Sequence, residues 1–306
     1  MPSRFTSRFT SRFTSSFTAV TAIATRPHAS ARRAVVLTLF AALAASSLGL
    51  GFAKPAHAAG ADDIKARGYL TVATEDDFKP FEFVDDGKPT GYDNEMLALV
   101  KKKLPVEVRQ QIMPWPGILP GVTTGKYDMA VTAVLVTPER KNTFDFTTPL
   151  VESTTYYATK KGSSIKSGDD LVGKVVGVQT GSAMLADLKA YDEALKKKHG
   201  GQGIKQIVEY QSYPEAYQDL GVGRLDAVAN TQINLNSLIK TRPDNFALGQ
   251  ALGQPVYIAW AVKKGNTAAL QMINAVLFDL RKSGEMYAMQ KKWFGASFES
   301  MPQSIN

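Results

Sequence analysis

The chain has 306 residues, 44% of them hydrophobic, and a formal net charge of +8 at pH 7. This length suffices for one large domain or two smaller ones, and the absence of cysteine excludes disulfides, thiolate metal sites and cysteine nucleophiles. Seven of the 36 basic residues and none of the 28 acidic ones fall in residues 1–58. The rest of the chain therefore carries a net charge of only +1, and a nucleic-acid-binding role loses its main support.

Residues 1–58 have the pattern of an export signal. An Arg-Arg pair precedes the apolar run 34–52, and Ala-His-Ala at 56–58 is typical of a signal-peptidase site. The run of 19 residues is long enough for a membrane anchor, but its Ala, Ser and Gly content and the cleavage-type sequence after it favour removal near Ala58. The SRFT repeats of residues 3–14 form a low-complexity extension. We therefore expect a soluble protein of the periplasm.

From residue 59 onward, short apolar runs alternate with helical patterns. A hairpin-like turn is predicted at Asp86-Gly87, followed by an amphipathic helix with Met96, Leu97 and Val100 on its inner face. Strands that alternate with helices indicate an α/β fold with parallel sheets covered on both faces, and we expect two lobes rather than one. The predicted strands are residues 69–74, 126–136, 175–180, 225–230 and 256–262.

The strand predicted at 126–136 is followed directly by the sequence TPER at 137–140. Thr137 is a good N-cap and the proline after it suits a first helical position, so a helix is predicted to begin at the carboxyl end of this strand. Ligands of open α/β sheets bind at that edge. Arg140 stands in the first helical turn, where the helix terminus favours an anion, and its guanidinium can hold a carboxylate through two parallel hydrogen bonds. The alternative is a surface arginine paired with a nearby acid such as Asp145.

Other strand ends carry groups suited to a small ligand. The run 175–180 is followed by Gly181-Ser182, the form of a second anion-binding turn. Trp115 lies between two prolines, where an indole does not easily serve as a helix-core residue, and Phe78 follows another strand end. Aromatic residues on loops beside an arginine indicate a pocket that stacks against a small ligand, with packing between lobes as the alternative for each.

The order and spacing of seven motifs resemble the solute-binding proteins of polar amino-acid ABC transporters, the bacterial extracellular solute-binding proteins of family 3. The motifs are PFEFVDDGKPTGYDNEML, WPGILPGVTTGKYDMAV, TPERK, FDFTTP, LVGKVVGVQTGS, SYPEAYQDLGVGRLDAV and KKWFG, spread over residues 62–296. The resemblance implies a two-lobed periplasmic-binding-protein fold of type II, with hinge crossings near 151–156 and 249–256 and the ligand in the cleft between the lobes. The implied bounds are 59–152 with 255–306 for lobe 1, which is discontinuous, and 153–254 for lobe 2.

The resemblance also implies which residues contact the ligand. Arg140 would bind the α-carboxylate of the ligand, and the backbone and hydroxyl of the Gly-Ser turn, at Ser182 and Ala183, would share it. Three further positions would contact the ligand, two aromatic ones that pack on its opposite faces and an acidic one that meets its side chain: Trp115, Phe78 and Glu75.

Two departures from the family pattern concern the ammonium group of an amino acid. Where the family usually has Gly-x-Thr, this chain has Ala133 and Leu135, and where it usually has an aspartate, this chain has Thr231 preceded by Asn230. An ammonium group enclosed without a counter-charge costs several kcal/mol. Two alternatives remain. Either the ligand is a small carboxylate without a free α-ammonium, or Glu75, Asn230 and backbone carbonyls hold an ammonium in a shifted pose.

These features predict the periplasmic component of an ABC importer, a monomer that captures an amino acid or related small carboxylate and delivers it to a membrane permease. A dehydratase-like enzyme on the same fold and a receptor that presents its ligand to a membrane sensor are the alternatives. Residues 59–306 contain one histidine, His199, in a polar loop, and the sequence shows no nucleophile–base pair or metal-ligand cluster. We therefore expect no enzymatic activity, cofactor, metal or nucleic-acid partner.

Overall fold

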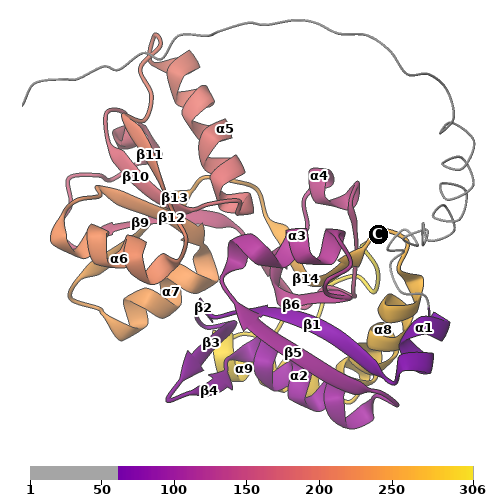
Figure 1. Ribbon diagram of the computed structural model, residues 1–306. Coiled ribbons are helices and arrows are strands. Elements are labelled where there is room, and N and C mark those ends of the chain that lie inside the picture. Colours follow the sequence, from indigo (N-terminus) through magenta and orange to yellow (C-terminus); the bar gives the residue numbers. More distant parts are fainter. Residues whose placement is uncertain (1–60, 306) are drawn as a thin grey trace, which may run out of the picture. The chain divides into compact units, whose positions relative to one another are not determined.

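The computed structural model describes residues 61–305. The predicted export signal and its extension, residues 1–58, lie outside the described residues. Two main β-sheets and a small three-stranded sheet form the framework, and helices pack around them (Figure 1). Within residues 61–305, no helix combines the length and the hydropathy needed to cross a membrane.

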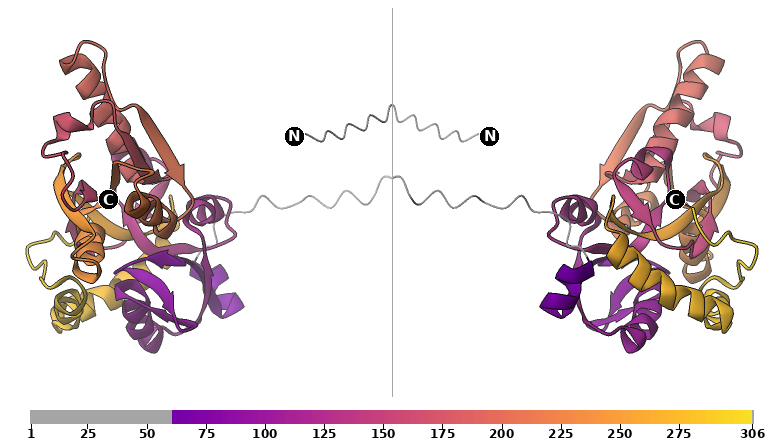
Figure 2. Two further views of the ribbon diagram at one scale, coloured as in Figure 1. Left: turned by 90° about the vertical axis from the view of Figure 1, so that its left-hand side faces the viewer. Right: turned by 90° about the vertical axis from the view of Figure 1, so that its right-hand side faces the viewer.

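The first main sheet has the strand order β5-β1-β6-β14-β7, and β8 also pairs with β14. We call this sheet and the helices packed on it the first lobe. Its helices come from both ends of the described chain, with α1 and α2 next to α8 and α9 (Figure 2). The strands are β1 (Tyr69–Glu75), β5 (Glu107–Met113), β6 (Met129–Leu135), β7 (Phe144–Phe146), β8 (Val151–Ser153) and β14 (Val256–Lys263). The helices are α1 (Ala61–Arg67), α2 (Tyr92–Lys103), α3 (Ile118–Thr123), α4 (Pro138–Lys141), α8 (Thr267–Lys282) and α9 (Glu285–Phe294), with a 3-10 turn at Trp115–Gly117.

The second main sheet has the strand order β11-β10-β12-β9-β13, and together with its helices it forms the second lobe. Helix α5 packs on β10 and β12, and α7 packs on β9 and β13. The strands are β9 (Thr155–Lys160), β10 (Val175–Gln179), β11 (Gln206–Tyr210), β12 (Ala227–Thr231) and β13 (Phe246–Ala251). The helices are α5 (Ala183–Lys198), α6 (Tyr213–Val222) and α7 (Gln232–Thr241), with a 3-10 turn at Gly168–Leu171.

The small sheet consists of β2 (Asp77–Phe78), β3 (Glu82–Asp85) and β4 (Lys88–Thr90). Asp86 and Gly87 join β3 to β4 and both have positive φ, 47° and 73°, as a two-residue hairpin turn requires. The predicted turn is thus confirmed. The helix predicted after it is α2, which buries the three apolar side chains expected on its inner face.

Both main sheets are mixed, so the expectation of parallel sheets is wrong. Strands β1, β5 and β6 run parallel, but β14 is antiparallel to β6. In the second lobe, β9 is antiparallel to β12 and β13 is antiparallel to β9. A parallel neighbour needs a crossover connection, usually a helix. β9 follows β8 directly across the lobes, and β14 follows β13 back, so neither strand has such a crossover.

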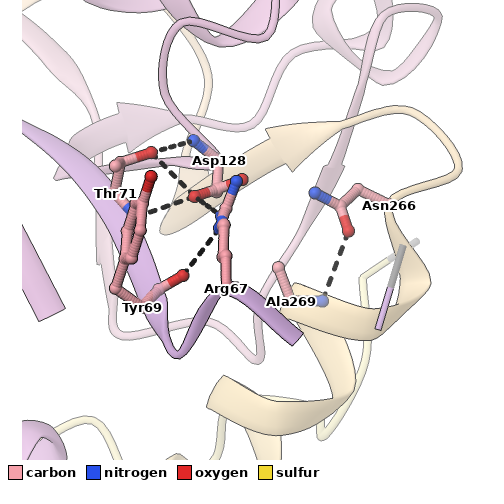
Figure 3. Close-up of polar contacts among 6 residues, drawn as sticks. All are labelled: Arg67, Tyr69, Thr71, Asp128, Asn266 and Ala269. Atoms are coloured by element: carbon pink, nitrogen blue, oxygen red, sulfur yellow. Dashed lines mark hydrogen bonds and ion pairs between the residues drawn. The ribbon is translucent and has the colours of Figure 1, made fainter. Parts of the chain in front are cut away.

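A buried carboxylate links β1 and β6 of the first lobe near their amino ends. Oδ2 of Asp128, which precedes β6, accepts hydrogen bonds of 2.7 Å from both the backbone nitrogen and the hydroxyl of Thr71, and it also pairs with the guanidinium of Arg67 (Figure 3). The same guanidinium donates through Nε to the Tyr69 carbonyl at 2.8 Å. This cluster holds α1, β1 and β6 together at the end of the sheet opposite the strand ends considered next.

Candidate ligand-binding site

The carboxyl ends of β1, β6 and β10 contribute side chains to one small cavity between the lobes. Its volume is about 10 Å³, room for no more than one water molecule, so a ligand enters only when the lobes separate. Eight of the ten side chains expected from the sequence line this cavity. The lining residues are Glu75, Phe78, Trp115, Ala133, Leu135, Arg140, Gln179, Ser182, Ala183 and Met184.

Arg140 brings a positive charge to the cavity. Its Nη1 donates to the Leu135 carbonyl at 2.9 Å, and its Nη2 reaches across the lobes to the Gly181 carbonyl at 3.4 Å. Its guanidinium lies 5.3 Å from the centre of the Trp115 ring. Burial lowers the pKa of Arg140 to about 10, against the attraction of Asp187 and Glu139, so the group stays charged at neutral pH. Among the described residues, no carboxylate forms an ion pair with it.

The predicted helix after β6 is present but short. Thr137 is its N-cap, and the Thr137 hydroxyl accepts a hydrogen bond of 3.2 Å from the Arg140 backbone nitrogen. Because α4 has four residues and its cap already uses this donor, the helix terminus contributes little to anion binding. The attraction for a carboxylate therefore comes from the Arg140 side chain.

A second anion-attracting element comes from the other lobe. Gly181 has a φ of 65° and turns the chain so that α5, a helix of 16 residues, begins at the cavity. Ser182 is the N-cap of α5, and its hydroxyl accepts from the Leu185 nitrogen at 3.2 Å and donates to the Gln179 carbonyl at 2.7 Å. The amino end of α5 favours a negative charge at Ala183. Arg140 and this helix end thus face one cavity from opposite lobes.

Glu75 and Gln179 meet across the lobes. Both side chains are buried, and Gln179 Nε2 donates to Glu75 Oε1 at 2.5 Å. Burial raises the pKa of the Glu75 carboxyl to about 8, while the hydrogen bond from Gln179 opposes the rise and the charges of Asp76 and Asp77 add to it. At neutral pH the carboxyl therefore carries its proton, and Arg140 is the charged group of the cavity.

Two aromatic side chains line the cavity. Phe78 and Trp115 are both buried, and the Phe78 ring lies 5.6 Å from the ring of Tyr213 in the second lobe. Phe78 also stacks against Phe81 at 6.0 Å. The contact with Tyr213 across the lobes holds the Phe78 ring beside the cavity.

Asn230 and Thr231 do not line this cavity. The Asn230 amide donates to the Tyr217 hydroxyl at 2.8 Å, and Thr231 caps α7, accepting from the Asn234 nitrogen at 3.3 Å. Asn230 faces a separate cavity of about 390 Å³ that is also lined by Asp77 and Tyr217. The polar groups of both side chains already have hydrogen-bond partners, and neither residue lines the cavity that contains Arg140.

Sequence reasoning missed Gln179 and Met184. Gln179 is the last residue of β10, so the strand-end rule that singled out Glu75 and Arg140 applies equally to it. The Gly-Ser turn that follows it is the more specific motif at this strand end. Met184 reads as an ordinary apolar helix residue, and only its place in the first turn of α5 brings it to the cavity.

Residues 70–296 match the family described as bacterial extracellular solute-binding proteins, family 3. The chain belongs to this family. It is 35% identical over 237 residues to the L-cystine-binding protein TcyJ of Escherichia coli, covering 76% of this chain and 85% of that protein. It is 30% identical over 264 residues to the probable histidine-binding protein of Neisseria gonorrhoeae, covering 83% of this chain and 94% of that protein.

Solved structures agree with these relatives. An ancestral arginine-binding protein bound to arginine has a TM-score of 0.66 and 34% identity, covering 75% of this chain and 99% of that one. A P235GK mutant of the arginine-binding protein of T. maritima has a TM-score of 0.68 and 32% identity, covering 77% and 99%. The two-lobed α/β fold predicted from the motifs is confirmed. The relatives are binding proteins, which confirms the prediction of a binding protein rather than an enzyme.

Proposed function

We propose that this protein is the amino-acid-binding component of an ABC importer and delivers its ligand to a membrane permease. The observation that carries the proposal is the meeting of Arg140 and the amino end of α5 at one cavity from opposite lobes. A carboxylate held between them closes the lobes around the ligand. The export pattern of residues 1–58 supports a periplasmic location, and the chain acts as a monomer.

The proposed ligand is an L-amino acid. Its support is the set of ligands of the similar proteins and structures, which are cystine, histidine, arginine and glutamine. A carboxylate without a free α-ammonium is the second candidate. Leu135 and the internally bonded Thr231 favour it, because neither offers the ammonium group a charged partner.

The proposed lobe bounds are 59–152 with 255–306 for the first lobe and 153–254 for the second. Two successive pairs of strands support them. β8 and β14 belong to the first sheet, whereas β9 and β13 belong to the second, so the chain passes between the sheets within 153–155 and 251–256. These segments are the proposed hinge.

Native mass spectrometry of the purified protein, followed by a thermal-shift panel, tests the proposed function. The panel contains the twenty standard amino acids, L-cystine, and the acids that lack the α-amino group. A ligand at 100 times its Kd stabilises the folded state by about 2.7 kcal/mol, which raises Tm by about 5–10 °C in a protein of this size. Absence of any bound small molecule and of any shift across the panel would contradict the proposal.

A contact between the lobes provides a separate prediction about ligand release. Asn234 Nδ2, on α7, donates to the Lys79 carbonyl of the first lobe at 2.7 Å. This bond stabilises the closed form, so Asn234→Ala should weaken ligand binding about two- to tenfold, mostly through faster dissociation. Stopped-flow fluorescence measures the rate. Asn236→Ala, an exposed change on the same helix, is the control, and equal dissociation rates in the two variants would disprove the role of the contact.

A further inference from the structure

Glu75 is a buried carboxyl group without a cation to pair with. Its side chain is 3% exposed, and among the described residues no lysine, arginine or histidine forms an ion pair with it. Its hydrogen-bond donor is the neutral amide of Gln179, at 2.5 Å. A buried carboxylate without a counter-ion is costly, so the carboxyl group retains a proton until a cation arrives.

The charged and titratable groups around Glu75 also favour its protonated form. Asp76 and Asp77 follow it in the chain, and their negative charges oppose its ionisation. Burial raises the pKa values of Glu82 on β3 and of Tyr213 and Tyr217 on α6, and the charge of Glu75 adds to each rise. Arg140 shares the cavity, but its guanidinium bonds two carbonyl oxygens and forms no ion pair with Glu75.

Gln179 connects this carboxyl to lobe closure. It is the last residue of β10 in the second lobe, whereas Glu75 is the last residue of β1 in the first. Separating the lobes breaks the hydrogen bond from Nε2 and frees Glu75 Oε1 at the site where the ligand enters. An ammonium group has three donors and a positive charge, so it can replace the amide donor and supply the missing counter-ion together.

We propose that Glu75 is the counter-charge for the α-ammonium group of an amino-acid ligand, and that binding replaces the Glu75 proton and the hydrogen bond from Gln179. This inference rests on the proposed function as an amino-acid-binding protein. The Glu75 O–H bond breaks, the proton passes to the solvent, and the resulting carboxylate pairs with the ammonium while Arg140 holds the ligand carboxylate. Glu75 thereby supplies the charged partner for the ammonium group that Leu135 and Thr231 do not offer.

The exchange predicts a measurable release of protons. Burial raises the pKa of Glu75 to about 8 in the closed form, so at pH 7 the closed, ligand-free protein holds this proton and binding of an amino acid should release up to one proton. Because the ligand binds the ionised form, affinity should rise by up to about tenfold per pH unit below the Glu75 pKa and level off above it. An acid without the α-amino group supplies no cation and should release almost no proton.

Isothermal titration calorimetry in phosphate, HEPES and Tris at pH 7 counts the released protons from the dependence of the heat on buffer ionisation. The probes are the amino acid with an uncharged side chain that gives the largest thermal shift and the acid that lacks its α-amino group, which for L-glutamine is glutaramate. Glu75→Gln should abolish the proton release and flatten the pH profile. Gln179→Met removes a hydrogen bond that lowers the Glu75 pKa, so the midpoint of the profile should move to higher pH.

Glu209→Gln is the matched control, because this exposed carboxyl lies on the neighbouring strand β11. It should keep both the proton release and the pH profile. The wild-type measurement needs no variant, so a misfolded Glu75→Gln leaves the test intact. Tight binding of the amino acid with no proton release overturns the proposal. Binding of amine-free acids alone also overturns it, but is still consistent with a carboxylate-binding site at Arg140. Binding of neither class overturns the proposed function itself.

Discussion

Replacing Arg140 by alanine should weaken ligand binding at least tenfold. Its guanidinium is the charged donor of the cavity and remains charged at neutral pH. A charge-assisted hydrogen bond contributes about 1.5–3 kcal/mol, which corresponds to about ten- to 150-fold in Kd. Arg140→Lys should also bind more weakly, because a lysine does not reproduce the two parallel hydrogen bonds of a guanidinium. Isothermal titration calorimetry measures both effects.

The control for this prediction is Arg109→Ala. Arg109 lies on the edge strand β5, where it is solvent-exposed, pairs with Glu107 and covers the ring of Tyr69. This change removes the same side chain away from the cavity and should leave Kd within twofold. A folded Arg140→Ala protein that retains wild-type affinity would remove Arg140 from the proposed site, and circular dichroism establishes whether the variant is folded.

Asp128→Ala should lower the free energy of unfolding by about 3 kcal/mol. The change leaves the backbone nitrogen and the hydroxyl of Thr71 without the acceptor they share, and it removes the partner of Arg67 (Figure 3). Chemical denaturation measures the loss, and Tm should fall by about 6–12 °C. Because the cluster lies at the opposite end of β1 from Glu75, ligand affinity below Tm should not change.

Asp244→Ala provides the comparison for this stability effect. Asp244 forms an exposed ion pair with Lys161 at 3.3 Å, and such pairs contribute less than about 1 kcal/mol. Asp128→Ala and Asp244→Ala therefore each remove an aspartate side chain, one from buried and one from exposed surroundings. Equal losses of stability in the two proteins would show that the hydrogen bonds to Thr71 do not carry the stabilisation assigned to them.

Local sequence patterns predict the strands that are buried along their whole length. β6 is buried at every position and was predicted from its apolar run, and the N-cap at Thr137 followed from the TPER sequence. β5 was not predicted, because it is the edge strand of its sheet and alternates exposed with half-buried positions, so it has no long apolar run. The expected parallel direction of β14 is wrong, because strand direction depends on which lobe the preceding segment occupies.

The sequence by itself determined the solute-binding family and two-lobed fold, through motifs in a recognisable order, and it singled out Arg140 at a strand end. Only the tertiary structure decided which strand ends share a cavity. It brought Gln179 against Glu75, and it turned Asn230 toward Tyr217 instead of toward Arg140. The physical reason is that the hydrophobic pattern of a strand reflects its burial within its own sheet and carries no information about the other lobe. The partner of a side chain at the cleft belongs to the other lobe, more than 100 residues away in the case of Glu75 and Gln179.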